Sequence, residues 1–86
     1  MSSIEELRIA LANSHRVGAL AAQGLQQAID NIEELQGTVS SAAQGSSSDV
    51  LNGATAAIEQ AHQLATEAYP VLYKALTDLN DYDSQL

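Results

Sequence analysis

Apolar residues recur at heptad spacing through residues 4–42, which read IEELRIALANSHRVGALAAQGLQQAIDNIEELQGTVSSA. With Ile4 at position a, every a and d position of this segment is apolar except Gly18 and Ser14. The acidic residues avoid these positions and fall on the solvent side of the repeat. A repeat sustained over nearly six heptads indicates a long amphipathic helix that packs against another helix.

A second heptad repeat begins at Leu51 and continues to Tyr82, out of phase with the first. Four consecutive d positions of this repeat are alanine, namely Ala54, Ala61, Ala68 and Ala75. Methyl side chains let two helix axes approach to the short end of the roughly 8–10 Å range. The second repeat therefore predicts a helix that packs tightly and antiparallel against the first.

The two repeats are separated by a short polar segment, QGSSSD at residues 44–49, which is typical of a turn. Ser48 or Asp49 is suited to cap the second helix, and Ser3 with Glu6 forms a capping box for the first. We predict an all-α antiparallel hairpin in one domain: a helix over about 3–43, a turn over about 44–48, a helix over about 49–82 and a frayed acidic C-terminus.

Two residues interrupt the helical pattern. Gly37 is followed by poor helix formers, but the heptad continues beyond it, so we expect a continuous but frayed helix there, and an end of the helix at Gln36 stays open. Pro70 lacks a backbone N–H and clashes with the carbonyl of Thr66, which predicts a kink in the second helix. Position 70 falls on the solvent side of the repeat, where this cost is lowest.

The apolar surface is wider than a single helix–helix seam requires. Ordering the chain costs on the order of 130 kcal/mol, at ~1.5 kcal/mol per residue, and an alanine-rich hairpin buries little apolar area in return. We therefore expect self-association into a homodimeric four-helix bundle, or a heterodimer with another helical hairpin. The predicted hairpin seam comprises Leu7, Leu11, Gly18, Ala21, Leu25, Ile32, Leu51, Ile58, Ala61, Ala65, Ala68, Leu72 and Leu79. The predicted partner face comprises Ile9, Val17, Leu20, Leu64, Tyr69, Val71 and Leu76.

One pattern has the spacing of metal ligands, because Glu59 and His62 form a Glu-x-x-His sequence. A hairpin that turns near residue 46 places Glu34 close to Glu59, and His15 close to Asp78. However, Glu34 and Glu59 occupy outward positions of the repeats, so neither a metal site nor a cofactor is predicted for the single chain. Whether an oligomer binds a metal through these three side chains stays open.

The composition narrows the classes of function. The chain has 11 acidic and 3 basic residues, a formal net charge of -8, and no cysteine. Such a charge argues against nucleic acid or an anionic membrane as a partner, and no apolar run approaches the ~20 residues of a membrane span. Residues 1–6 lack the pattern of a cleavable signal peptide, so we expect a cytoplasmic protein, or one exported without such a signal. No catalytic constellation is present, and the expected function is a non-enzymatic role in interaction or assembly.

The turn and its flanking helices resemble a known family. The segment AAQGSSSD, residues 42–49, is similar to the turn of the small helical hairpins of the WXG type, which type VII secretion systems of actinobacteria and related Gram-positive bacteria export. In that family the turn carries Trp-x-Gly, and here Gly45 stands in the glycine position while Ala43 stands in place of tryptophan. The family's Tyr-x-x-x-acid signal is not reproduced, because Thr77 follows Tyr73 at that spacing.

The resemblance implies a hairpin fold and a role as a secreted hairpin or as its heterodimer partner. The chain is also similar to small uncharacterised hairpin proteins of actinobacteria that are rich in Ala, Glu and Leu, for which no activity is implied. The acidic composition adds one more alternative, an inhibitor that binds a basic protein.

Overall fold

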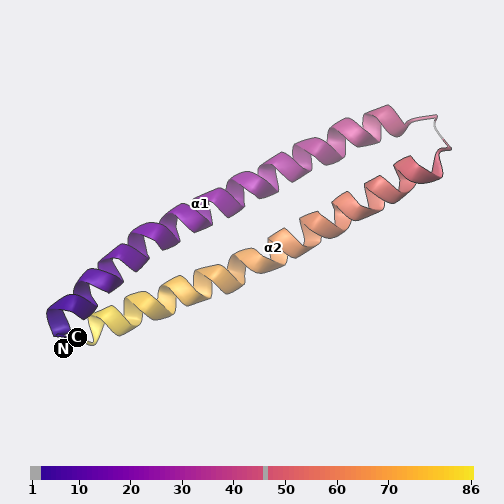
Figure 1. Cartoon of the computed structure of the whole chain (residues 1–86). Helices are drawn as coiled ribbons and strands as arrows, with labels where there is room; N and C mark the ends of the chain where they lie inside the picture. Colours follow the sequence, from indigo (N-terminus) through magenta and orange to yellow (C-terminus); the bar gives the residue numbers. More distant parts are fainter. Residues whose placement is uncertain (1–2, 46) are drawn as a thin grey trace.

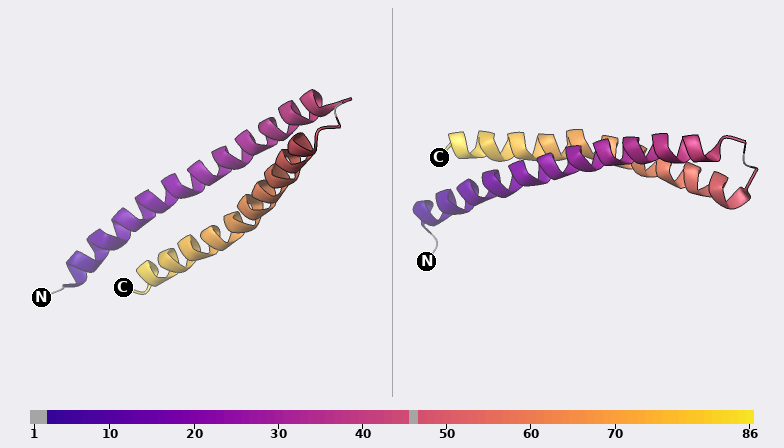
Figure 2. Two further views of the ribbon diagram at one scale, coloured as in Figure 1. Left: turned by 45° about the vertical axis from the view of Figure 1, so that its right-hand side comes forward. Right: turned by 90° about the horizontal axis from the view of Figure 1, so that it is seen from above.

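The chain folds into an antiparallel hairpin of two long helices, as the heptad patterns predict (Figure 1). The structure is a computed structural model that describes residues 3–45 and 47–86. Helix α1 spans Ile4–Ala43 and helix α2 spans Asp49–Ser84. The hairpin measures 64 × 20 × 15 Å, and Figure 2 shows the helices side by side from the turn to the termini, crossing at a shallow angle. The predicted all-α fold is confirmed.

Both helices begin at the serine caps that the sequence predicts. The Ser3 hydroxyl accepts a hydrogen bond from the Glu6 backbone N–H at 3.1 Å, and the Ser48 hydroxyl accepts one from Leu51 N–H at 3.3 Å. Each bond satisfies a donor that the first helical turn otherwise leaves unpaired. Beyond the C-terminus of α1, Gly45 adopts a φ of 79°, a left-handed conformation that glycine enters without steric cost.

Neither Gly37 nor Pro70 ends its helix. Helix α1 continues through Gly37, and α2 continues through Pro70 to Ser84, two residues beyond the predicted end. At that end the Arg8 guanidinium donates a hydrogen bond to the Leu86 carbonyl oxygen at 3.2 Å. A positive group beside the C-terminus of a helix opposes the negative end of its dipole and offsets the nearby acidic residues.

The seam of α1, the line along which it contacts α2, follows a period of about 3.6 residues and not the 3.5 of a strict heptad. As a result the seam moves from d positions to e positions along the helix. The expectation that Ala21 lies in the seam was wrong, because Ala21 is exposed and Ala22 lies inward in its place. The buried and half-buried positions of α1 are Leu7, Leu11, Ser14, His15, Gly18, Ala22, Leu25, Ala28, Ile29, Ile32, Gln36, Val39 and Ala43.

Helix α2 differs more from the prediction, because it turns its a and e positions inward and leaves its alanine d positions exposed. Ala61 and Ala68, which were predicted in the seam, are therefore exposed, whereas Tyr69 and Leu76, which were predicted on the partner face, lie in the seam. Burial free energy scales with apolar area, so larger side chains gain more from the seam than methyl groups do. The half-buried positions are Leu51, Thr55, Ile58, His62, Ala65, Tyr69, Leu72, Leu76, Leu79 and Asp83.

The core between the helices is thin. Among the described residues, only Leu11 and Ile29 are buried, with 5% and 6% of their surface exposed. Towards the turn, the helices leave an open groove of about 240 Å³ between them, whose lining includes Val39 and Ile58. Of the five glycines, Gly18 is the one packed against the opposite helix, because a β-carbon there would collide with the Leu76 side chain.

Candidate interaction surface

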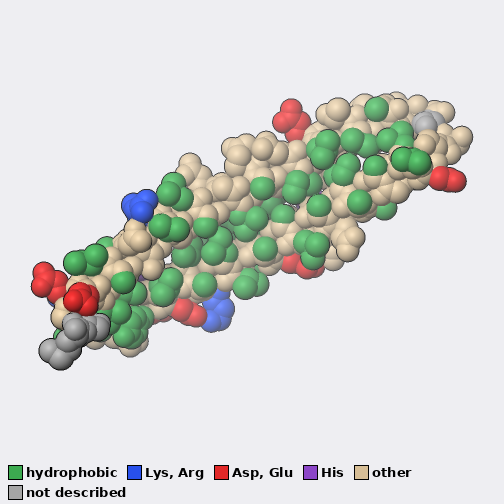
Figure 3. Space-filling view, in the orientation of Figure 1, with side chains coloured by type: hydrophobic (Ala, Val, Ile, Leu, Met, Phe, Trp, Pro, Cys, Tyr) green, Lys and Arg blue, Asp and Glu red, His purple; other side chains and the backbone are tan. Residues whose placement is uncertain are grey.

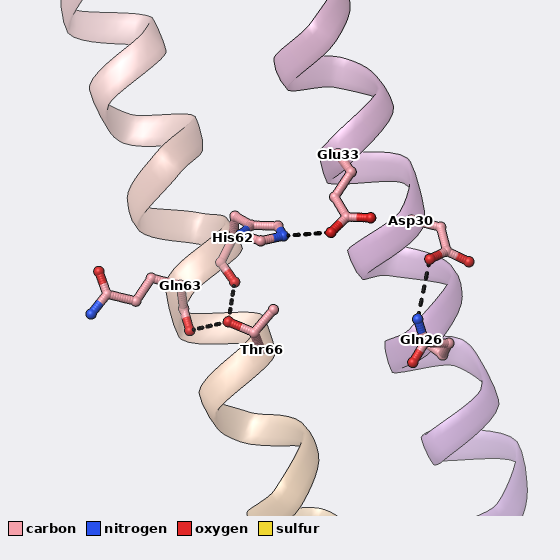
Figure 4. A network of polar contacts seen from close by, with 6 residues as sticks. All are labelled: Gln26, Asp30, Glu33, His62, Gln63 and Thr66. Carbon is pink, nitrogen blue, oxygen red and sulfur yellow. Dashed lines mark hydrogen bonds and ion pairs between the residues drawn. The ribbon is translucent and has the colours of Figure 1, made fainter.

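One broad side of the hairpin carries its charged and polar contacts. The Glu33 carboxylate of α1 lies 2.9 Å from the His62 Nε2 of α2, which is the clearest polar contact between the helices (Figure 4). Near it, the Gln26 side-chain amide donates a hydrogen bond to the Asp30 carboxylate at 3.1 Å. Glu59 lies on the same side of α2, about a quarter turn from the seam. We call this side the polar face.

The opposite side of the hairpin, which we call the apolar face, is exposed and carries no charge from Val17 to the turn, whereas Glu6 lies at its terminal end. In each helix its residues lie about a quarter turn from the seam in the same rotational sense, and antiparallel helices bring these two stripes to the same side. Figure 3 shows this side, with hydrophobic side chains along both helices and charged ones at the margins and ends. The apolar face comprises Val17, Ala21, Gly24, Leu35, Ala42, Val50, Ala54, Ala57, Ala61, Leu64, Ala68, Val71 and Ala75.

The predicted partner residues are divided between three places, because Tyr69 and Leu76 lie in the seam. Val17, Leu64 and Val71 lie on the apolar face, with 48%, 59% and 70% of their surface exposed. Ile9 and Leu20 lie instead towards the outer edge of α1, away from the seam, and are 64% and 56% exposed. The exposed alanines of α2 were assigned to the wrong surface from sequence. The signal that could have placed them is the absence of charge from these positions.

The acidic residues considered as metal ligands do not converge. His62 contacts Glu33, whereas the sequence pairing had considered Glu34 and Glu59. Both of those carboxylates lie on exposed residues, and within residues 3–45 and 47–86 no three His, Cys, Asp or Glu side chains are grouped to hold a metal ion.

The two ends of the hairpin differ in charge. The end that carries the termini holds five acidic residues, Glu5, Glu6, Asp78, Asp81 and Asp83, and the three bases of the chain, Arg8, Arg16 and Lys74, lie in the same half of the hairpin. The turn end is nearly uncharged, since Asp49 is the one charged residue between positions 36 and 58.

The polar contacts at the terminal end are half-buried in the seam and exposed on the outer side of α2. His15 Nε2 lies 3.5 Å from the Asp83 carboxylate, where the sequence pairing had placed Asp78. The Lys74 ammonium instead donates a 2.6 Å hydrogen bond to Asp78 within α2. This bond, together with the negative charge of Asp78, raises the pKa of Lys74 above 10.5. The end stays acidic, because its five acidic residues outnumber the three bases.

The exposed surface of the hairpin is large for its mass. A compact monomer of 9.0 kDa exposes about 4,900 Å², whereas this chain exposes 6251 Å². The excess of about 1,400 Å² is close to the area of one long side of the molecule, which at 64 × 20 Å is of the order of 1,300 Å². One covered face would bring the chain to the exposure of an ordinary folded protein.

Comparison with protein-family models, curated proteins and solved structures finds no match for this chain. Within the described residues, neither helix has the apolar length that crossing a bilayer demands.

Proposed function

We propose that this protein is a non-enzymatic assembly module, in which hairpins associate through the apolar face to form a four-helix bundle. The observation that carries the proposal is the excess exposed surface. Only two of the described residues are buried, so the single hairpin has little core of its own. Covering about 1,400 Å² on each of two chains would bury about 2,800 Å² in total, within the range of obligate homodimers. Such interfaces are apolar and resemble a protein core divided in two.

The residues of the apolar face support this proposal. Leu64, Val71 and Val50 expose 59%, 70% and 84% of their surface, although each could fill a bundle core. The intervening alanines and Gly24 allow a second helix to approach closely. Between Val17 and the turn no charge needs to be desolvated when this face is covered, which avoids a large cost of forming an interface.

The test is the native mass of the purified chain, measured by light scattering across a dilution series. We expect a dimer that persists at micromolar concentration and separates, with loss of helical signal, on further dilution. A chain that stays monomeric and helical at every concentration would overturn the proposal. A poorly helical monomer would show that the face requires a different protein, such as a second type of hairpin.

Two variants test whether the apolar face forms the interface. Leu64 and Ile9 are similarly exposed in the single hairpin, at 59% and 64%, but Ile9 lies on the outer edge of α1. We expect Leu64→Glu to weaken the dimer at least 100-fold, because it places a charge inside the interface. Ile9→Glu, the matched control, leaves the dissociation constant within a few-fold. Equal effects of the two substitutions would exclude the apolar face as the interface.

A further inference from the structure

We propose that the occupant of the apolar face is a second copy of this chain in antiparallel orientation, with the turn of one hairpin over the termini of the other. This inference rests on the proposed function and adds the arrangement of the two copies. A flat face admits two such arrangements with a two-fold axis, one with like ends together and one with like ends apart. The distribution of charge along the hairpin distinguishes them.

Like ends together would place two acidic ends side by side. Each terminal end holds five acidic residues, and in that arrangement the two groups are separated by about the 20 Å width of the hairpin or less. The screening length is about 8 Å at physiological salt, so groups at the facing edges repel each other. The arrangement with like ends apart separates the two acidic groups by up to the 64 Å length of the molecule, and at that distance salt fully screens their repulsion.

The antiparallel arrangement also places each acidic end over the turn end of the partner copy, which carries little charge. The turn end of the partner copy holds one charged residue, Asp49, between positions 36 and 58. Exposed apolar side chains at the two ends then cover each other. Val50 is 84% exposed near the turn, and Tyr82 is 45% exposed on the same side of α2 near the termini. Overlaying unlike ends brings these two side chains from different copies towards one another.

Distances between spin labels on the full-length chain test this arrangement without requiring an exact register. The chain has no cysteine, so Gln44→Cys at the turn accepts a single nitroxide label per copy. Gln44 lies outside both helices and off the apolar face. In the antiparallel dimer the two labels lie at opposite ends, separated by approximately the 64 Å length of the hairpin. In the parallel dimer they lie within about its 20 Å width.

A second labelled variant, Ser84→Cys, provides the matched control at the other end of the molecule. We expect a long distance in each labelled homodimer, and a short distance when the Gln44→Cys and Ser84→Cys chains are mixed. A short distance in the Gln44→Cys homodimer, alone or beside a long one, overturns the antiparallel arrangement and leaves the proposed self-association standing. No coupling between labels, with a monomeric mass by light scattering, overturns both.

Discussion

Stability in this hairpin is concentrated in a few side chains, because most of the seam is half-exposed. Leu11 and Ile29 of α1 are the buried apolar residues among those described. Their neighbours in the seam keep part of their surface in water and gain proportionally less from the hydrophobic effect. Substitutions at chemically identical residues should therefore differ sharply in effect, depending on where the residue lies.

Two isoleucines of α1 provide a direct comparison. Ile29 is 6% exposed and Ile9 is 64% exposed. We expect Ile29→Ala to lower the free energy of unfolding by about 2–4 kcal/mol, through lost burial and the cavity left behind. Ile9→Ala should change it by less than about 0.5 kcal/mol, as for other exposed positions. Urea unfolding at one fixed protein concentration measures both, and similar losses would contradict the assignment of the seam.

Two glycines of α1 form a second comparison. At Gly37 an added methyl group meets nothing within 4 Å, so Gly37→Ala should stabilise the helix by roughly 0.5–1 kcal/mol. At Gly18 the same group collides with the Leu76 side chain, which must move. Gly18→Ala should therefore be less stable than Gly37→Ala by at least about 1 kcal/mol. Equal stability in thermal unfolding would mean that Leu76 does not pack against α1 at this level.

Each helix presents three surfaces: an inward seam, the polar face and the apolar face. In α2, Leu72 and Leu76 lie in the seam, while Ala68 and Ala75 lie on the apolar face. The two helices place their apolar stripes on the same side, so the hairpin as a unit is strongly two-sided. A helix with a single neighbour requires only the seam, and the extra stripe is typical of a helix with more than one neighbour.

Helix α2 continues through Pro70, and the proline lowers the stability of the helix. Proline lacks the N–H that would bond to the Thr66 carbonyl, and it is unfavourable in a helix interior by about 3 kcal/mol relative to alanine. Because Pro70 is exposed, Pro70→Ala should raise the free energy of unfolding by about 1–3 kcal/mol. Thr77→Ala, at another exposed position, should raise it by no more than about 0.7 kcal/mol. If Pro70→Ala is destabilising in chemical denaturation, the packing of α2 requires the proline.

The whole molecule combines the apolar face with a strongly acidic remaining surface. Each chain carries a formal charge of -8, so two copies repel each other at long range even when their contact surface is neutral. Raising the salt concentration screens this repulsion and leaves apolar contacts intact. Whether the dissociation constant falls or rises with added salt therefore distinguishes an apolar interface from one held by charge pairs.

We expect the dissociation constant of the dimer to fall several-fold between low salt and about 0.5 M sodium chloride, because the screening length shortens. Sedimentation equilibrium at a series of salt concentrations measures this. Weaker association at high salt would show that charge pairs, and not the apolar face, hold the copies together. The same series with Leu64→Glu is a control, since its buried charge keeps the chains apart at every salt concentration.

The sequence by itself determined the local features: two helices, the turn between them and the serine caps. These depend on contacts within a few residues, which the amino-acid order specifies directly. Only the tertiary structure decided which part of each wide apolar surface turns inward. A straight helix repeats every 3.6 residues, so a seam assigned by heptads drifts by about 20° per repeat and exchanged Ala21 for Ala22. In α2, the packing against α1 decided whether the alanines or the larger apolar side chains turn inward. Tyr69 and Leu76 lie in the seam, and the alanines at the d positions lie on the apolar face.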